Sequence, residues 1–162
     1  MEIYVSNYSS VYHWNNQTHR TDGPAVIWKN GYKAWYLYNK LHREDGPAEQ
    51  LETGKEWAID GKVYMIERSD LTSYYLNDRL HCLNGPALTT QTDKQWHING
   101  LRHRLDGPAT VFFDRIEYWQ YGQLHREDGP AVIWQNGNKE YWFCDVYYTY
   151  KDYLKLLKLE LL

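Results

Sequence analysis

The chain has little of several features that would define a class of function. It has only two cysteines, Cys82 and Cys144, in 162 residues. Two thiols are too few for a disulfide scaffold or for a zinc site made of cysteine alone, so we interpret them as reduced thiols. No apolar run approaches the roughly 18 residues of a membrane span, and the first residues lack the basic and apolar segments of a secretory signal. We therefore expect a cytoplasmic protein that does not contact a membrane.

An excess of charge of one sign is also lacking. The formal net charge of −3 gives no basic footprint for nucleic acid, and it falls short of the dense acidity of a DNA mimic. Aromatic residues are abundant, at 17% of the chain, and rings among basic side chains would suit a single-stranded nucleic acid. The negative charge makes nucleic acid the less favoured partner, and it leaves protein binding as the main use for exposed rings.

Proline is confined to one repeated motif, His-Arg-x-Asp-Gly-Pro-Ala. Four copies begin at His19, His42, His103 and His125, and an altered copy with Cys and Asn in place of Arg and Asp begins at His81. The five prolines are Pro24, Pro47, Pro86, Pro108 and Pro130, and the motif aspartates are Asp22, Asp45, Asp106 and Asp128. The copies are 22 or 23 residues apart, except for 39 residues between His42 and His81. A fixed period of this size indicates a repeat array.

Each repeat has the pattern of a β-hairpin. An aromatic residue stands seven residues before each motif histidine, and the intervening side chains alternate with period two, as in a strand. The next two residues are rich in Asn and Gly, for example Asn15-Asn16 and Asn99-Gly100, which suit a two-residue hairpin turn. The Asp-Gly-Pro-Ala segment predicts a second bend, because proline is excluded from central strands. We predict a mostly β fold, an elongated antiparallel β-hairpin repeat array.

The hairpin pattern is interrupted twice, after Val63-Tyr64 and after Val146-Tyr147. These two matching exits divide the chain into an N-terminal sub-array over 1–64, an insertion over 65–73 and a C-terminal sub-array over 74–148. In the insertion, Ser69 or Asp70 could cap a short helix.

Residues 149–162 are predicted to form a C-terminal helix. Thr149 is a suitable N-cap, and Leu154, Leu157 and Leu161, with Tyr153 and Leu156 beside them, form an apolar stripe at helical spacing. Such a helix would cover the last edge of the sheet, because open edges invite unwanted pairing.

The units resemble the MORN repeat in a divergent form. The segments Trp35–His42 and Trp96–Gly100 are similar to the first part of that repeat, whereas Arg-x-Asp-Gly-Pro-Ala replaces its Gly-x-Gly corner. The resemblance covers about residues 11 to 148, and this variant resembles proteins of tailed bacteriophages and large DNA viruses. It implies a scaffold of β-hairpins, and MORN proteins have been credited with lipid or protein binding. The altered corner does not favour lipid.

The recurring polar residues suggest two chemistries. Five histidines in register could serve as metal ligands or general bases, but a residue repeated in register is more often part of the packing, bonded to a neighbouring backbone or to the motif aspartate. The motif arginines and aspartates are interpreted as a ladder that pairs opposite charges on neighbouring repeats. We find no phosphate-binding loop, no nucleophile elbow and no Cys-His dyad. We therefore expect no enzyme activity, no cofactor and no metal.

These observations favour a non-catalytic protein-binding repeat protein. The viral resemblance extends this to a phage-encoded inhibitor of a host enzyme or defence complex, such as a nuclease, a CRISPR effector or an ATP-dependent protease. Two alternatives stay open: a structural viral protein that assembles into homo-oligomers, and a protein that sequesters a nucleotide signal. The predicted partner-binding residues are Arg43, Glu44, Arg126 and Glu127, in the two nearly identical His-Arg-Glu-Asp copies, where the two sub-arrays could act as a bivalent clamp.

Overall fold

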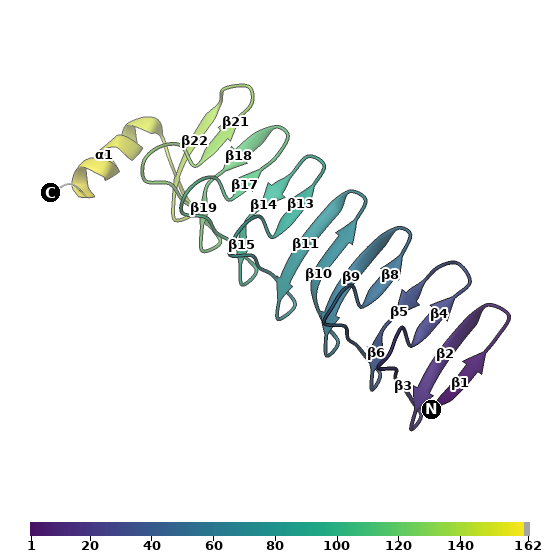
Figure 1. Cartoon of the computed structure of the whole chain (residues 1–162). Coiled ribbons are helices and arrows are strands. Elements are labelled where there is room, and N and C mark those ends of the chain that lie inside the picture. The colour runs from purple at the N-terminus through teal and green to yellow at the C-terminus, as the bar shows by residue number, and fades with distance from the viewer. Residues whose placement is uncertain (161–162) are drawn as a thin grey trace. The chain divides into compact units, whose positions relative to one another are not determined.

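The computed structural model describes residues 1–160, and over these residues the fold is mostly β with a helix near the C-terminus (Figure 1). The described chain divides into two compact units, Met1–Asp78 and Arg79–Leu162. The sub-arrays predicted from the sequence, 1–64 and 74–148 with an insertion over 65–73, stay a prediction. The predicted mostly β antiparallel hairpin repeat with a C-terminal helix is confirmed as a fold class.

The first unit is an antiparallel sheet with strand order β1-β2-β4-β5-β8-β9-β10-β11. Two short strand pairs, β2–β3 and β6–β7, extend from it. The strands are β1 (Glu2–Val5), β2 (Ser9–Trp14), β3 (Gln17–Thr18), β4 (Val26–Trp28), β5 (Lys33–Ala34), β6 (Tyr36–Leu37), β7 (Lys40–Leu41), β8 (Glu49–Leu51), β9 (Gly54–Ile59), β10 (Lys62–Arg68) and β11 (Leu71–Leu76).

The second unit repeats this plan in the order β13-β14-β17-β18-β21-β22-β23, with short hairpins β15–β16 and β19–β20. Its elements are β12 (Arg79–Leu80), β13 (Leu88–Thr90), β14 (Lys94–Gln95), β15 (His97–Ile98), β16 (Leu101–Arg102), β17 (Thr110–Val111), β18 (Arg115–Glu117), β19 (Trp119–Gln120), β20 (Gln123–Leu124), β21 (Val132–Trp134), β22 (Lys139–Phe143), β23 (Val146–Tyr148) and α1 (Tyr150–Glu160).

The predicted two-residue hairpin turns are present. Both residues of each turn have positive φ, for example 46° and 59° at Asn15 and Asn16, and 51° and 85° at Asn99 and Gly100. This conformation matches the right-handed twist of the flanking strands and explains the preference for Asn and Gly. The strand before each turn is less regular than the alternation suggests. In three repeats it breaks at the motif aromatic, which is Trp35, Trp96 or Tyr118, whereas β2 and β11 run unbroken through Tyr12 and Tyr74. At the first of these breaks the N–H of Trp35 donates to the Ala48 carbonyl of the next corner (2.8 Å).

The core is built from alanine. All seven alanines of the chain are fully buried, and five of them are the motif alanines. They are Ala25, Ala34, Ala48, Ala58, Ala87, Ala109 and Ala131. Larger side chains are mostly half-buried or exposed, so successive repeats approach closely through small residues instead of enclosing a wide apolar interior.

The predicted short helix over 65–73 is wrong. Strand β10 continues to Arg68, the chain turns at Ser69 and Asp70, and β11 returns from Leu71. Ion pairs between β9 and β10 support the longer strands: Arg68 Nη2 lies 2.6 Å from Glu56, and Lys55 Nζ lies 3.1 Å from Glu67. Strand pairing also satisfies the backbone along β10, which a single helical turn could not do.

The C-terminal helix is confirmed from Tyr150 to Glu160. The Thr149 hydroxyl accepts from the Asp152 N–H (3.2 Å) and donates to the Asp152 carboxylate (2.7 Å), so Thr149 is the N-cap as predicted. Within the expected apolar stripe, Tyr153 makes the buried contact, and Leu156 and Leu157 are half-buried. Leu154 is exposed, and Leu161 lies outside the described residues.

Within residues 1–160, no helix combines the length and the apolar character that crossing a bilayer requires.

Candidate functional site

The segment His-Arg-x-Asp-Gly-Pro-Ala, called here the motif corner, is organised around its arginine. In each of the four intact corners, the guanidinium stacks on the motif aromatic, donates from Nε to the aspartate two residues later and reaches the proline carbonyl. For Arg104 these partners are the Trp96 ring (4.2 Å to its centroid), Asp106 (2.8 Å) and Pro108 (3.3 Å). The motif glycine leaves room for this arrangement: a Cβ on Gly107 would lie 3.1 Å from the guanidinium carbon of Arg104.

The same contacts recur at Arg20, Arg43 and Arg126, whose Nε atoms lie 2.7, 2.8 and 2.6 Å from their own aspartates. The predicted ladder between neighbouring repeats is therefore wrong, because each arginine pairs within its own corner. The altered corner supports this interpretation. Cys82 replaces the arginine there, and a Cβ on Gly85 would have no neighbour within 4 Å.

The motif histidines accept hydrogen bonds from the backbone, which is one of the two packing roles predicted for them. Nδ1 of each ring accepts the N–H of the first turn residue in the following hairpin. The five contacts are His19 with Tyr38 (3.3 Å), His42 with Asp60 (3.2 Å), His81 with Asn99 (3.1 Å), His103 with Tyr121 (3.1 Å) and His125 with Cys144 (3.3 Å). Backbone bonds such as Arg43 N–H to Ala58 O and Arg104 N–H to Trp119 O add a second link between successive repeats.

The carboxylates of the corners face solvent while the arginines do not. The four motif arginine side chains are only 19 to 25% exposed, whereas Asp22, Asp45, Asp106 and Asp128 are 72 to 85% exposed. Glu44 and Glu127 add further exposed carboxylates at 84 and 66%. A partner would therefore meet mainly negative charge at these corners, with the positive charge held behind it.

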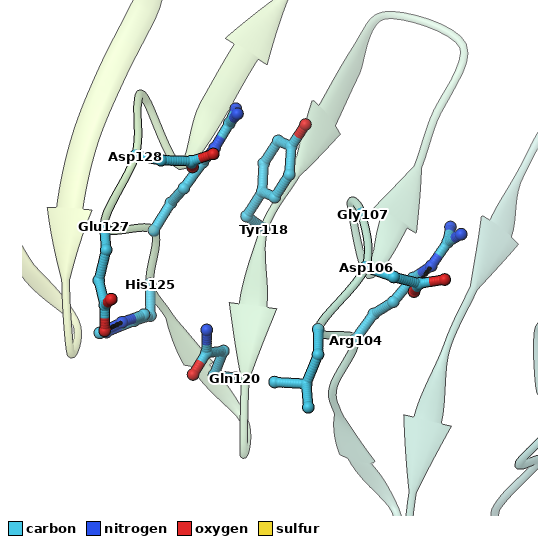
Figure 2. A pocket seen from close by; sticks show the side chains of 10 residues that line it. Arg104, Asp106, Gly107, Tyr118, Gln120, His125, Glu127 and Asp128 are labelled. Carbon is cyan, nitrogen blue, oxygen red and sulfur yellow. Dashed lines mark hydrogen bonds and ion pairs between the residues drawn. The ribbon is translucent and has the colours of Figure 1, made fainter.

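Adjacent corners enclose open grooves. In the first unit, the corners at His19 and His42 border a groove of about 600 Å³ with Trp35 and Leu37 in its wall. In the second unit, the corners at His103 and His125 border a groove of about 450 Å³, lined by Tyr118 and Gln120 (Figure 2). A third groove of about 370 Å³ lies between the altered corner and the next one. We call these spaces the corner grooves.

The structure places all four predicted partner-binding residues in the corner grooves. Arg43 and Glu44 line the groove of the first unit, and Arg126 and Glu127 line one in the second. The guanidiniums of Arg43 and Arg126 are engaged by their own aspartates and aromatic rings. Glu44 and Glu127 are therefore the members of this set whose charge faces solvent, although one carboxylate oxygen of Glu127 also lies 3.3 Å from His125 Nε2.

One close pair was missed in the sequence. Cys144 Sγ lies 3.3 Å from His125 Nδ1, and His125 Nε2 lies 3.3 Å from Glu127 Oε1. The prediction that there is no Cys-His dyad is therefore wrong. Nineteen residues separate Cys144 from His125, and only the stacking of the turn on the corner brings them together. Over the described residues, no group of three or more His, Cys, Asp or Glu side chains could hold a metal ion.

Two kinds of group make folding depend on pH. Burial lowers the pKa of His97, assisted by the charge of Arg102, while a bond to the Gly100 carbonyl acts in the opposite direction. The arginine hydrogen bond in each intact corner lowers the pKa of the motif aspartate. In both cases the unfolded chain binds more protons, so stability is lost as the pH falls.

We therefore expect the free energy of unfolding to decrease in two steps on acidification. The first begins below about pH 6.5, where an unfolded histidine takes up a proton, and the second begins below about pH 4, where unfolded aspartates do. Urea unfolding at pH 7.5, 5.5 and 3.5 measures both steps. His97→Gln should reduce the first step, and Asp106→Asn should reduce the second. If His97→Gln leaves the loss between pH 7.5 and 5.5 unchanged, the assignment to His97 is wrong.

The fold and the corners define a class: this is a β-hairpin repeat protein whose intact motif corners each carry an arginine clamp. No family model matches the chain, and neither the curated proteins nor the solved structures gave a match. The similarity to MORN repeats thus stays a prediction from the sequence.

Proposed function

We propose that this protein is a non-catalytic scaffold that binds another protein through the corner grooves. The observation that supports this most is the division of charge at the corners. The arginine guanidiniums bond and stack within their own corners. Glu44 and Glu127, in contrast, present exposed carboxylates at the rims of grooves with aromatic walls. Aromatic rings beside satisfied polar groups are typical of protein interfaces, and the exposed carboxylates favour a partner with lysine or arginine side chains.

The proposal also includes a viral origin for the protein and a target in the host cell, as the sequence suggests. Resemblance to repeat proteins of tailed bacteriophages and large DNA viruses supports an inhibitor that acts in the host cytoplasm on an enzyme or a defence complex. A nuclease, a CRISPR effector and an ATP-dependent protease are the target classes to assay first. Inhibition would require only that the bound scaffold obstruct a functional surface, so it needs no chemistry from this chain.

The test compares two charge-matched double variants in affinity purification from lysate. Glu44→Gln with Glu127→Gln removes two carboxylates from the corner grooves. Glu52→Gln with Asp70→Asn removes two exposed carboxylates from loops outside those grooves. We expect a partner captured by the wild type to be retained by the loop variant and reduced by up to about thirtyfold by the groove variant, since each of the two exposed contacts contributes up to about 1 kcal/mol. Equal capture by both variants would rule out the corner grooves as the binding site.

Self-assembly is favoured by one separate observation. Among the described residues, β1 pairs only with β2, and its apolar side chains Ile3, Tyr4 and Val5 are exposed. Exposed edge strands can pair with another chain. Light scattering at increasing protein concentration distinguishes this function from binding a different protein: a monomer at all concentrations excludes it.

A further inference from the structure

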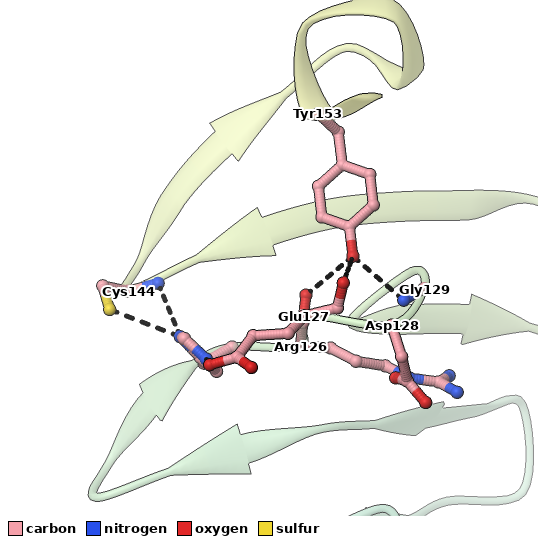
Figure 3. Close-up of polar contacts among 7 residues, drawn as sticks. Arg126, Glu127, Asp128, Gly129, Cys144 and Tyr153 are labelled. Carbon is pink, nitrogen blue, oxygen red and sulfur yellow. Dashed lines mark hydrogen bonds and ion pairs between the residues drawn. The ribbon is translucent and has the colours of Figure 1, made fainter. Parts of the chain in front are cut away.

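The pair formed by Cys144 and His125 has the elements of an activated thiol. Sγ of Cys144 lies 3.3 Å from Nδ1 of His125, and the other ring nitrogen lies 3.3 Å from the Glu127 carboxylate. In nucleophilic sites, cysteine is activated by this arrangement, in which a base contacts the nucleophile and a third group orients the base. Figure 3 shows the dashed contacts at Cys144, with Glu127 on the motif corner beside it.

The tautomer of His125 suits the role of a base. The Glu127 carboxylate can only accept, so it favours the tautomer with the proton on Nε2. The backbone N–H of Cys144 also donates to Nδ1 (3.3 Å), which requires that Nδ1 carry a lone pair. The His125 ring packs against the Phe143 ring, with 4.5 Å between the two centroids, and His125 is only 7% exposed. Nδ1 thus carries no proton, and its one lone pair faces both the backbone N–H and the thiol of Cys144.

Cysteine is not the residue that this turn itself favours. Cys144 has a φ of 50°, and the equivalent first turn positions hold Asn15, Tyr38, Asp60, Asn77, Asn99 and Tyr121. Asn and Asp tolerate this conformation best, and Cys has no such advantage. Cys144 is also solvent-exposed, so a small reagent can reach the sulfur.

We propose that Cys144 is a reactive thiol that undergoes exchange with low-molecular-weight disulfides of the glutathione type. The Cys144 thiol gives its proton to Nδ1 of His125. The resulting thiolate attacks one sulfur of the disulfide, a new S–S bond forms to Cys144 as the old one breaks, and the leaving thiolate recovers the proton from His125. Cys144 is oxidised to a mixed disulfide and the small disulfide is reduced to one thiol. This proposal shares Glu127 with the proposed protein-binding site, but thiol reactivity is measured without a partner and does not depend on that function.

The repeats supply a matched control and a gain-of-function test. Asn15 occupies the same turn position with a φ of 46°, but it lies in the first hairpin and no motif corner precedes it. Asp60 occupies that position opposite His42, whose Nε2 lies 3.8 Å from Glu44. In a background lacking both native cysteines, Asn15→Cys therefore places a thiol in the turn without a motif histidine opposite it, and Asp60→Cys places one beside a motif histidine and a glutamate.

The measurement is the second-order rate of reaction with 5,5′-dithiobis(2-nitrobenzoate), followed by intact-mass detection of the adduct formed with glutathione disulfide. With Cys82→Ser as the background, Cys144 should react on the order of tenfold faster at pH 7 than the Asn15→Cys thiol. Asp60→Cys should gain most of this increase.

Glu127→Gln tests the orienting group, because it keeps the shape of the side chain and removes its charge. It should lower the Cys144 rate and shift the pH–rate profile while the far-ultraviolet circular dichroism spectrum stays unchanged. A Cys144 rate equal to that of the Asn15→Cys thiol, or a rate and pH profile that Glu127→Gln leaves unaltered, would overturn the proposal.

Discussion

Tyr153→Ala is expected to release α1 from the second unit. The Tyr153 ring is 2% exposed and packs against Tyr141 at 4.9 Å between centroids. Its hydroxyl accepts the Gly129 N–H (2.9 Å) and lies against the carbonyls of Arg126 (3.0 Å) and Glu127 (Figure 3). Truncating a buried aromatic side chain to alanine costs about 3 to 5 kcal/mol, and the loss here also leaves corner backbone groups without partners.

The loss of stability in Tyr153→Ala has two parts, one from the hydroxyl hydrogen bonds and one from the packing of the ring. Tyr153→Phe keeps the ring and removes the hydroxyl, so it should cost about 1 to 3 kcal/mol. Leu154→Ala alters the exposed neighbour and should change stability by less than about 0.5 kcal/mol. Urea unfolding gives the energies, and hydrogen exchange at the Gly129 amide reports the docking directly. An exchange rate at Gly129 that Tyr153→Phe leaves unchanged would contradict this account of the helix.

Ala109→Leu should produce the second large loss of stability. Ala109 is fully buried at the end of a motif corner, and its carbonyl accepts the Trp96 N–H (2.8 Å). A leucine side chain is larger than the fully buried site holds, so it would displace the neighbouring repeat. Overpacking of this kind costs about 1 to 3 kcal/mol, and we expect the upper end because the alanine is fully buried.

The matched control for Ala109 lies four residues earlier. Leu105 belongs to the same corner and is 73% exposed, so Leu105→Ala should leave the urea midpoint nearly unchanged. If Ala109→Leu is as mild as Leu105→Ala, the close approach of the repeats through alanine is not what holds them together.

The hairpins could be predicted because they depend on local chemistry. A two-residue turn needs positive φ twice, and Asn15-Asn16 or Asn99-Gly100 supplies it without reference to distant residues. The backbone role of the motif histidines followed in the same way from repetition. The break of the strand at Trp35 was not visible, because the alternation of side chains continues through it while the hydrogen bonding changes partner.

The features that were missed depend on which segments pack together. Arg104 was expected to pair with a neighbouring repeat, but its own aromatic and aspartate lie closer. Strands form where a helix was expected near Ser69 and Asp70. The ion pairs that support these strands come from Glu56 and Lys55, which are more than ten residues away in the sequence. The contact between Cys144 and His125 is of the same kind, because it exists only where one turn stacks on the preceding corner.

The most direct test of the proposed function is hydrogen exchange of the protein alone and bound to the partner that the wild type captures. Binding through the corner grooves predicts slower exchange of backbone amides in residues 43–46 and 126–129, with the exposed strand β1 (Glu2–Val5) unchanged. Protection confined to β1, with no change at either corner, would contradict the proposal and assign binding to the edge of the sheet.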